Sequence, residues 1–188
     1  MPTPTTRTLN PLPFNVLEPK RFEDLVRQLA YGFRRWRMLE ATGRMGSDEG
    51  YDARGFEITT DDADVDVETQ DDDSMPVRTT DRIWLIQCKR ERSIGPAKMR
   101  QYLGEIADHE AHGLYGIIFA AACDFSMTTC EVLRNWCRDH GISEVHVWGK
   151  GEIEDQLFQP KNDHLLFAYF GISLQIRRRS ARTSLRSC

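Results

Sequence analysis

The sequence predicts an α/β protein with a mixed central sheet flanked by helices. Two observations lead to this fold class. Apolar residues recur at helical spacing near the start of the chain, at Phe22, Leu25, Val26 and Leu29. Later, the continuous apolar run at residues 114–122 is typical of a strand that is buried on both faces, as in a parallel sheet. With 188 residues, of which 40% are hydrophobic, the chain can form one domain with a substantial core.

The predicted elements follow one another in the order α-β-β-β-α-β-α-β. The first helix spans residues 17–33, and Pro19 suits its first turn. After the third strand, a helix is expected from Ile94 to Gly113. Ser126 is the predicted N-cap of the next helix, which Gly141 ends. The remaining elements are strands at 35–42, 51–59, 82–89, 114–122 and 145–148 and short helices at 152–158 and 164–170.

Charge is segregated along the chain, although the net charge is only −4. Residues 61–73 hold eight acids and no base, whereas residues 177–188 hold five arginines and no acid. The acidic net charge therefore does not argue against a nucleic-acid partner. We expect a flexible lead-in at 1–13, a main domain at 14–148 with an acidic insertion at 60–81, and a helical extension at 149–174. The final residues, 175–188, are expected to be a basic tail or the point where a longer protein was cut.

The composition favours the cytoplasm. The cysteines number five, an odd count, and include no C-x-x-C pair, which suits a reducing compartment better than a disulfide scaffold. No apolar run approaches the ~18 residues of a membrane span. The first residues lack the apolar segment of a secretory signal. We therefore expect a cytoplasmic protein with no membrane partner.

The strand at 82–89, RIWLIQCK, ends in polar residues that indicate a ligand-binding site. Strand side chains alternate between faces, so Gln87 and Lys89 share a face that is expected to leave the core, while Cys88 points into the core on the other. Open α/β sheets bind ligands at such strand ends. Asp52 begins the preceding strand, with 34 residues between it and Gln87. If the strands pair, these two can offer oxygens to one Mg²⁺ beside Lys89.

Three segments then suggest a family: FEDLV on the first helix, GSDEGYDARGFEI, and IWLIQCKR. In this order they resemble the PD-(D/E)XK nuclease superfamily, and specifically its Mrr-like, type IV restriction branch, in which Q-x-K replaces (D/E)-x-K. The resemblance covers roughly residues 14–148. It implies a restriction-endonuclease-like α-β-β-β-α-β core and Mg²⁺-dependent cleavage of DNA, with Mn²⁺ as a substitute.

Carried onto this chain, the resemblance makes Asp52, Gln87, Lys89 and Glu23 the catalytic residues. Asp52, Gln87 and Glu23 would hold the metal, and Lys89 would serve the attacking water and the transition state. From spacing alone, Glu23 flanks the apolar stripe of the first helix and reads as a solvated residue, so its role rests on the resemblance. Asp48 and Glu49, which lie shortly before Asp52 in the sequence, are either solvated loop residues or acids of which one replaces or assists Asp52.

DNA is the expected partner, in a bacterial restriction or anti-phage system. A homodimer or a larger defence complex is left open as the assembly. Two other functions also remain open. One is a nuclease-like DNA-binding or interaction module that does not cut, because Gln87 brings one negative charge fewer to the metal than a carboxylate would. The other is a structure-specific resolvase of the same superfamily.

Overall fold

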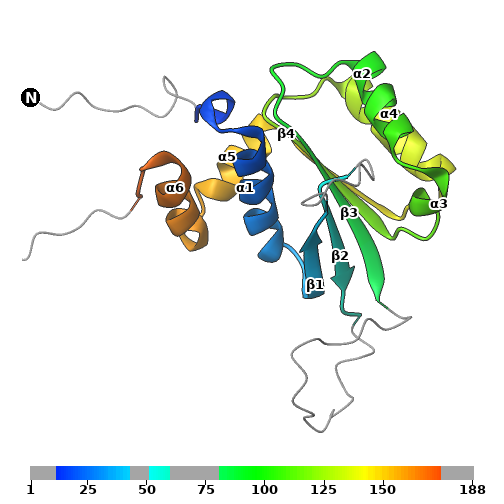
Figure 1. Cartoon of the computed structure of the whole chain (residues 1–188). Helices are drawn as coiled ribbons and strands as arrows, with labels where there is room; N and C mark the ends of the chain where they lie inside the picture. Colours follow the sequence, from blue (N-terminus) through cyan, green and yellow to red (C-terminus); the bar gives the residue numbers. More distant parts are fainter. Residues whose placement is uncertain (1–11, 43–50, 60–80, 175–188) are drawn as a thin grey trace, which may run out of the picture.

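The computed structural model describes residues 12–42, 51–59 and 81–174. In these residues the chain forms one mixed sheet with helices on both faces (Figure 1). The sheet has five strands that lie side by side in chain order. They are β1 (Trp36–Ala41), β2 (Ala53–Glu57), β3 (Arg82–Lys89), β4 (Gly116–Ala121) and β5 (Glu144–Trp148). Neighbours are antiparallel from β1 to β3 and parallel from β3 to β5. The predicted α/β class with a mixed sheet is confirmed.

Six α-helices occur in the described residues. They are α1 (Pro19–Tyr31), α2 (Pro96–Glu105), α3 (Asp108–Ala111), α4 (Met127–Asp139), α5 (Lys150–Leu157) and α6 (Asp163–Phe170). Two short 3₁₀ helices, η1 (Phe14–Val16) and η3 (Pro160–Asn162), were not predicted. Ser126 caps α4 as predicted, because its hydroxyl accepts the backbone N–H of Thr129 at 3.2 Å.

The single helix predicted between Ile94 and Gly113 is wrong in one respect, because the structure divides it into α2 and α3. The backbone is extended at Ile106 and Ala107, which ends α2 and starts α3. This break allows both Ile106 and Ala111 to be buried in the same core, at 3% and 0% exposure. Ile106 and Ala111 are five residues apart, so in one continuous helix they would lie on different faces and could not both point into this core.

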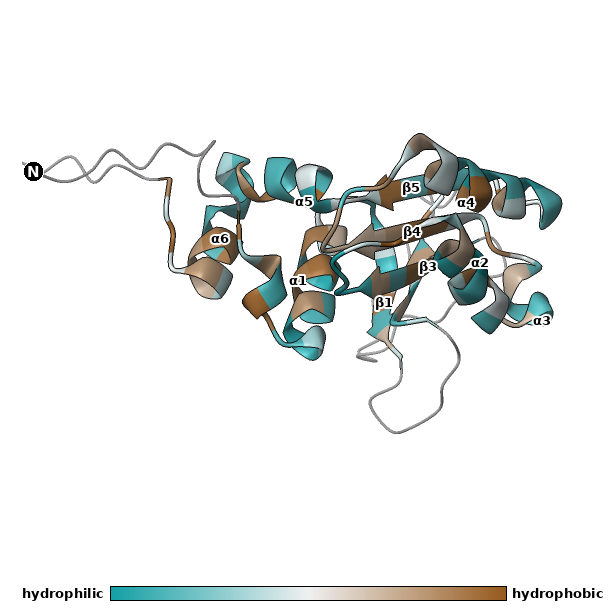
Figure 2. Ribbon diagram, turned by 90° about the horizontal axis from the view of Figure 1, so that it is seen from above, coloured by the Kyte–Doolittle hydropathy of each residue, from teal (hydrophilic) through white to brown (hydrophobic). Residues whose placement is uncertain are grey.

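The helices cover the two faces of the sheet as separate groups (Figures 1 and 2). On one face, α1, α5 and α6 form a core with Trp84, Ile86 and Cys88 of β3. On the other face, α2, α3 and α4 form a second core with Leu85. The alternation of β3 therefore continues to its end, and the prediction that Cys88 belongs to the core is confirmed.

The C-terminal helices belong to the same packed body as the main domain. Ile153, Leu157 and Leu166 are fully buried in the cluster that includes Phe22 of α1. At the other end, the predicted flexible lead-in is wrong at Leu12. This residue is 3% exposed, and its backbone N–H donates to the Glu154 carboxylate at 2.6 Å. Burying an apolar side chain of this size favours order over a flexible tail.

Two predicted segments lie outside the described residues: almost all of the acidic insertion, at 60–80, and the basic tail at 175–188. The last residue of that insertion, Asp81, is described. Its carboxylate is buried and accepts a 2.8 Å hydrogen bond from the Arg37 guanidinium of β1. Among the helices of the described chain, none has the length and apolar character needed to cross a bilayer.

Trp84 requires a residue without a side chain on the neighbouring strand. A Cβ added at Gly116 would lie 2.4 Å from the Trp84 ring, which is fully buried and donates its indole N–H to Glu57 at 2.8 Å. We expect Gly116→Ala to lower the free energy of unfolding in urea by about 1–3 kcal/mol, because the ring must move within a packed core.

Gly104→Ala is the matched control for this substitution. Gly104 lies in α2, and an added Cβ there meets nothing within 4 Å. It should stabilise the protein by about 0.5–1 kcal/mol through helix propensity. Equal unfolding free energies for Gly116→Ala and wild type would show that Trp84 is not packed against Gly116.

Candidate functional site

The candidate site lies at the edge of the sheet where β3, β4 and β5 end. Because β2 runs antiparallel to β3, its first residues lie at the same edge. Ala53 faces Ile86 in the register, and the backbone N–H of Asp52 donates to the Ile86 carbonyl at 3.0 Å. The strand pairing on which the predicted site depends is thus present. It brings Asp52 level with Gln87, the next residue along β3.

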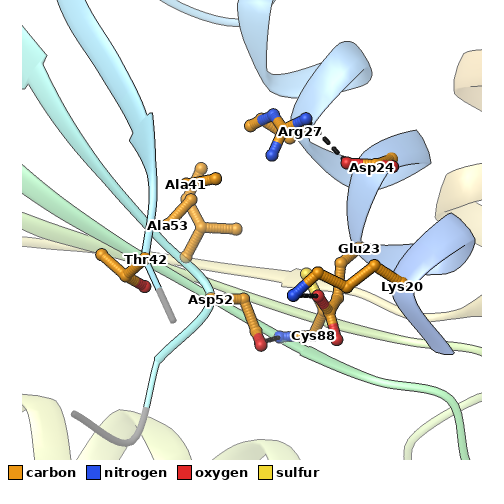
Figure 3. A pocket seen from close by; sticks show the side chains of 10 residues that line it. Lys20, Glu23, Asp24, Arg27, Ala41, Thr42, Asp52, Ala53 and Cys88 are labelled. Carbon is orange, nitrogen blue, oxygen red and sulfur yellow. Dashed lines mark hydrogen bonds and ion pairs between the residues drawn. The ribbon is translucent and has the colours of Figure 1, made fainter. Parts of the chain in front are cut away.

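The Asp52 carboxylate is fixed by the backbone of β3. One oxygen, Oδ2, accepts the N–H of Cys88 at 2.6 Å, as Figure 3 shows. Thr42 holds the same stretch from the end of β1: its N–H donates to the Asp52 carbonyl at 3.0 Å and its hydroxyl to the Tyr51 carbonyl at 2.6 Å. Three strands therefore determine where this carboxylate lies.

A small pocket opens beside Asp52, on the face of the sheet that α1 covers (Figure 3). Glu23 of α1 lines it, with a side chain 28% exposed and Lys20 Nζ 3.7 Å from its carboxylate. Arg27 lies farther along α1 and is paired with Asp24 at 2.7 Å. The pocket is lined by Lys20, Glu23, Asp24, Arg27, Ala41, Thr42, Asp52, Ala53, Ile86 and Cys88. The structure therefore places Glu23 and Asp52 together, as the resemblance implies.

Burial raises the pKa of Asp52 from 3.8 to about 6. The hydrogen bond from Cys88 opposes this shift, while the charge of Glu23 adds to it. The ammonium groups of Lys89 and Lys20 act in the lowering direction. Glu23 and Lys89, which belong to opposite helical layers, thus both act on the charge of this carboxyl group.

The burial of Gln87 differs from what the sequence predicts. Strand alternation puts it on the same face as Leu85, opposite Phe119 of β4, and it is completely buried. The expectation that it leaves the core is wrong, because the packed layer on that face extends to the end of β3. Gln87 does not line the pocket that holds Asp52 and Glu23. Its carboxamide thus approaches this edge from the opposite side of the strand.

Lys89 also lies on the face of α2. Its side chain is 23% exposed, and Nζ is 4.0 Å from the Glu105 carboxylate. The same atom lies 4.5 Å from the centroid of the Tyr102 ring. The predicted residues therefore meet at one edge but reach it from two directions: Glu23 from the layer of α1, and Gln87 and Lys89 from the layer of α2.

The side chains at this edge suit a hard divalent cation. Mg²⁺ takes oxygen ligands and commonly uses one or two carboxylates together with water. The hydrogen-bond donor to the Asp52 carboxylate is a neutral backbone amide, and burial disfavours the negative charge of this group. A nearby cation would therefore stabilise the ionised form of Asp52. Within the described residues, no cluster of three or more His, Cys, Asp or Glu side chains could hold a metal. A cation in this pocket would therefore rely on the carboxylates of Asp52 and Glu23. Gln87 does not line the pocket, so its role as a third oxygen ligand stays a prediction.

Sequence reasoning missed two residues that shape the site. Thr42 acts through hydrogen bonds to the backbone carbonyls of Tyr51 and Asp52, which no pattern of side chains in the sequence reveals. Tyr102 falls on the apolar face of its helix, three residues after Met99, so the spacing indicates burial but not its contact with Lys89. Asp48 and Glu49, the alternative acids, lie outside the described residues.

Comparison with known proteins gives no match among protein families, curated proteins or solved structures. The geometry and chemistry of the site are therefore the structural grounds for a function.

The raised pKa of Asp52 predicts a pH-dependent stability. The folded protein binds this proton more tightly than the unfolded chain does, since about 6 exceeds 3.8. The contribution of Asp52 to the free energy of unfolding therefore falls as the pH rises between these values, and is constant above them. In EDTA, Asp52→Asn should match wild type near pH 4 and exceed it by on the order of 2 kcal/mol near pH 7.

Urea unfolding at a series of pH values measures this difference. Glu131→Gln removes one negative charge from an exposed position on α4 and serves as the control. A difference between Asp52→Asn and wild type that stays the same from pH 4 to pH 7 would show that Asp52 is not desolvated.

Proposed function

We propose that this protein is a metal-dependent endonuclease that hydrolyses phosphodiester bonds in DNA, with a restriction-endonuclease-like core. One observation carries the proposal: the partly buried Asp52 carboxylate lies at the sheet edge with Glu23 in its pocket and Lys89 within electrostatic reach. Two carboxylates can hold the metal ion for a metal-assisted phosphodiester hydrolysis, and a lysine can stabilise the negative charge of its transition state. A role in bacterial restriction or anti-phage defence rests on the resemblance of the sequence motifs alone.

Each residue would have a separate task. Asp52 and Glu23 bind the cation through their carboxylates, and Gln87 supplies a neutral oxygen. When bound, Mg²⁺ makes its water more acidic and stabilises negative charge at phosphorus. Lys89 places a positive charge where the phosphoryl oxygens gain negative charge in the transition state. The hydrogen bond from Cys88 keeps the Asp52 carboxylate in one orientation, so it need not reorganise during the reaction.

A neutral amide in the place of a third carboxylate favours the second candidate function, a DNA-binding module that does not cut. Gln87 is fully buried and carries no charge, so it attracts a divalent cation less strongly than Glu would. Metal binding and cleavage must therefore be measured separately.

Cleavage of supercoiled plasmid DNA tests the main proposal. Wild type should nick or linearise it in Mg²⁺ or Mn²⁺ and not in EDTA. Lys89→Met should lower the rate by about 10²–10³-fold, the usual cost of losing one group that stabilises transition-state charge. Asp52→Asn should abolish cleavage because it removes a metal ligand. Asp155→Asn and Lys161→Met change the same residue types at exposed positions and serve as controls. Equal rates in all five proteins would identify a contaminating nuclease.

Direct binding of Mn²⁺, followed by electron paramagnetic resonance, separates the two candidate functions. Asp52→Asn should weaken binding at least about tenfold, since even residues behind the ligands contribute on this scale. Gln87→Glu should tighten it, and should destabilise the metal-free protein because it buries a charge. If Gln87→Glu leaves Mn²⁺ affinity unchanged, Gln87 is not a ligand. If wild type binds Mn²⁺ and DNA without cutting, the non-cutting module is correct.

A further inference from the structure

The side chain of Lys89 lies against an aromatic ring, and its ion pair with an acid is long. Nζ is 4.5 Å from the centroid of the Tyr102 ring, whereas Glu105, the acid paired with it, is 4.0 Å away and 43% exposed. The face of an aromatic ring attracts a cation through its quadrupole. Such an attraction leaves the N–H donors of an ammonium group available, whereas a close carboxylate would occupy one or more of them.

Tyr102 is itself held in place by a hydrogen bond to Glu91. It belongs to α2 and is only 7% exposed. Its hydroxyl donates to one carboxylate oxygen of Glu91, and the ammonium group of Lys98 donates to the other. Glu91 follows β3 by two residues, so the chain that leaves the site strand returns to fix the ring beside Lys89.

The two lysines near this ring therefore have different roles. Lys98 is in direct contact with the Glu91 carboxylate, and its Nζ is 5.9 Å from the ring centroid. Lys89 is closer to the ring, and its charge acts on Asp52. Lys98 thus contributes to holding Glu91, and Lys89 is the lysine that the ring presents to the candidate site.

We propose that Tyr102 is the positioning residue of Lys89: its buried ring fixes the ammonium group at the sheet edge, where the N–H donors can reach a phosphate group. The effect on cleavage rests on the proposed function, but the contact itself does not. Tyr102 acts through Lys89 and has no part in binding the metal.

Nuclear magnetic resonance of lysines labelled by reductive ¹³C-methylation tests the contact without any assay of activity. The modification keeps the positive charge, and the chain has only five lysines, so Lys89→Arg assigns the Lys89 signal. A ring at this distance should shift the proton resonances of these methyl groups upfield. Tyr102→Leu should remove that shift and Tyr102→Phe should retain it. An unchanged Lys89 signal in folded Tyr102→Leu would overturn the proposal.

Plasmid cleavage by the same variants tests the consequence. Tyr102→Leu should lower kcat about tenfold with little change in KM, the pattern expected when only transition-state stabilisation is lost. Tyr102→Phe should restore most of the rate, because it keeps the ring. Tyr115→Leu is the matched control: it removes a ring that lies 4.2 Å from the guanidinium carbon of Arg82, at the start of β3 and thus at the opposite end of the strand from Lys89. Thermal unfolding confirms that each variant is folded.

The outcomes distinguish the two proposals. If wild type cuts no DNA, the proposed function fails, while the Lys89 signal still decides whether Tyr102 holds this lysine. If the signal moves in Tyr102→Leu but kcat stays at the wild-type value, or Tyr102→Phe is as slow as Tyr102→Leu, the ring does not position Lys89 for the reaction.

Discussion

The hydrogen bond from the Cys88 N–H to the Asp52 carboxylate connects the fold of this protein to its chemistry. It is 2.6 Å long and forms where β2 starts beside the end of β3. A carboxylate at a strand end could adopt several rotamers, but a backbone donor allows few of them. Glu23 and Lys89 can act together with Asp52 only because this carboxylate oxygen is fixed. The same bond opposes the rise in the pKa of Asp52 that burial causes.

The core on either side of β3 maintains this geometry. Trp84 and Ile86 anchor the strand against α1, and Leu85 anchors it against α2 and α4. Glu23 and Lys89 then reach the strand end from opposite layers, so both helical layers must be in place for the site to exist. Local loosening of α1 or α2 would separate these charges without unfolding the sheet. The site is therefore a property of the whole sandwich of helices and sheet, although its residues lie at one edge.

The sequence could predict much of this arrangement because strand periodicity and strand order are local signals. The apolar run at residues 83–86 predicted a buried central strand, and the neighbouring strand was predicted to start near Asp52. Burial of Gln87 could not be predicted, since alternation assigns a face but not how far the packed layer extends along it. The roles of Thr42 and Tyr102 also could not be predicted, because they depend on backbone bonds and on the distance between a helix and a strand. The break after α2 was missed because Ile106 still falls at helical spacing from Leu103, so the apolar pattern gives no sign that the helix ends there.

The hydrogen bond between Cys88 and Asp52 can be followed through the amide resonance of Cys88, in a ¹⁵N-labelled sample titrated with acid and base. This signal should follow the ionisation of Asp52, with a midpoint near the pKa of about 6 in EDTA. Saturating Mg²⁺ should move the midpoint to lower pH, because a bound cation favours the ionised carboxylate. The titration should be absent in Asp52→Asn. A Cys88 signal that does not titrate between about pH 4 and 8 would show that this bond does not report on Asp52, and a midpoint that is the same with and without Mg²⁺ would show that Asp52 binds no cation.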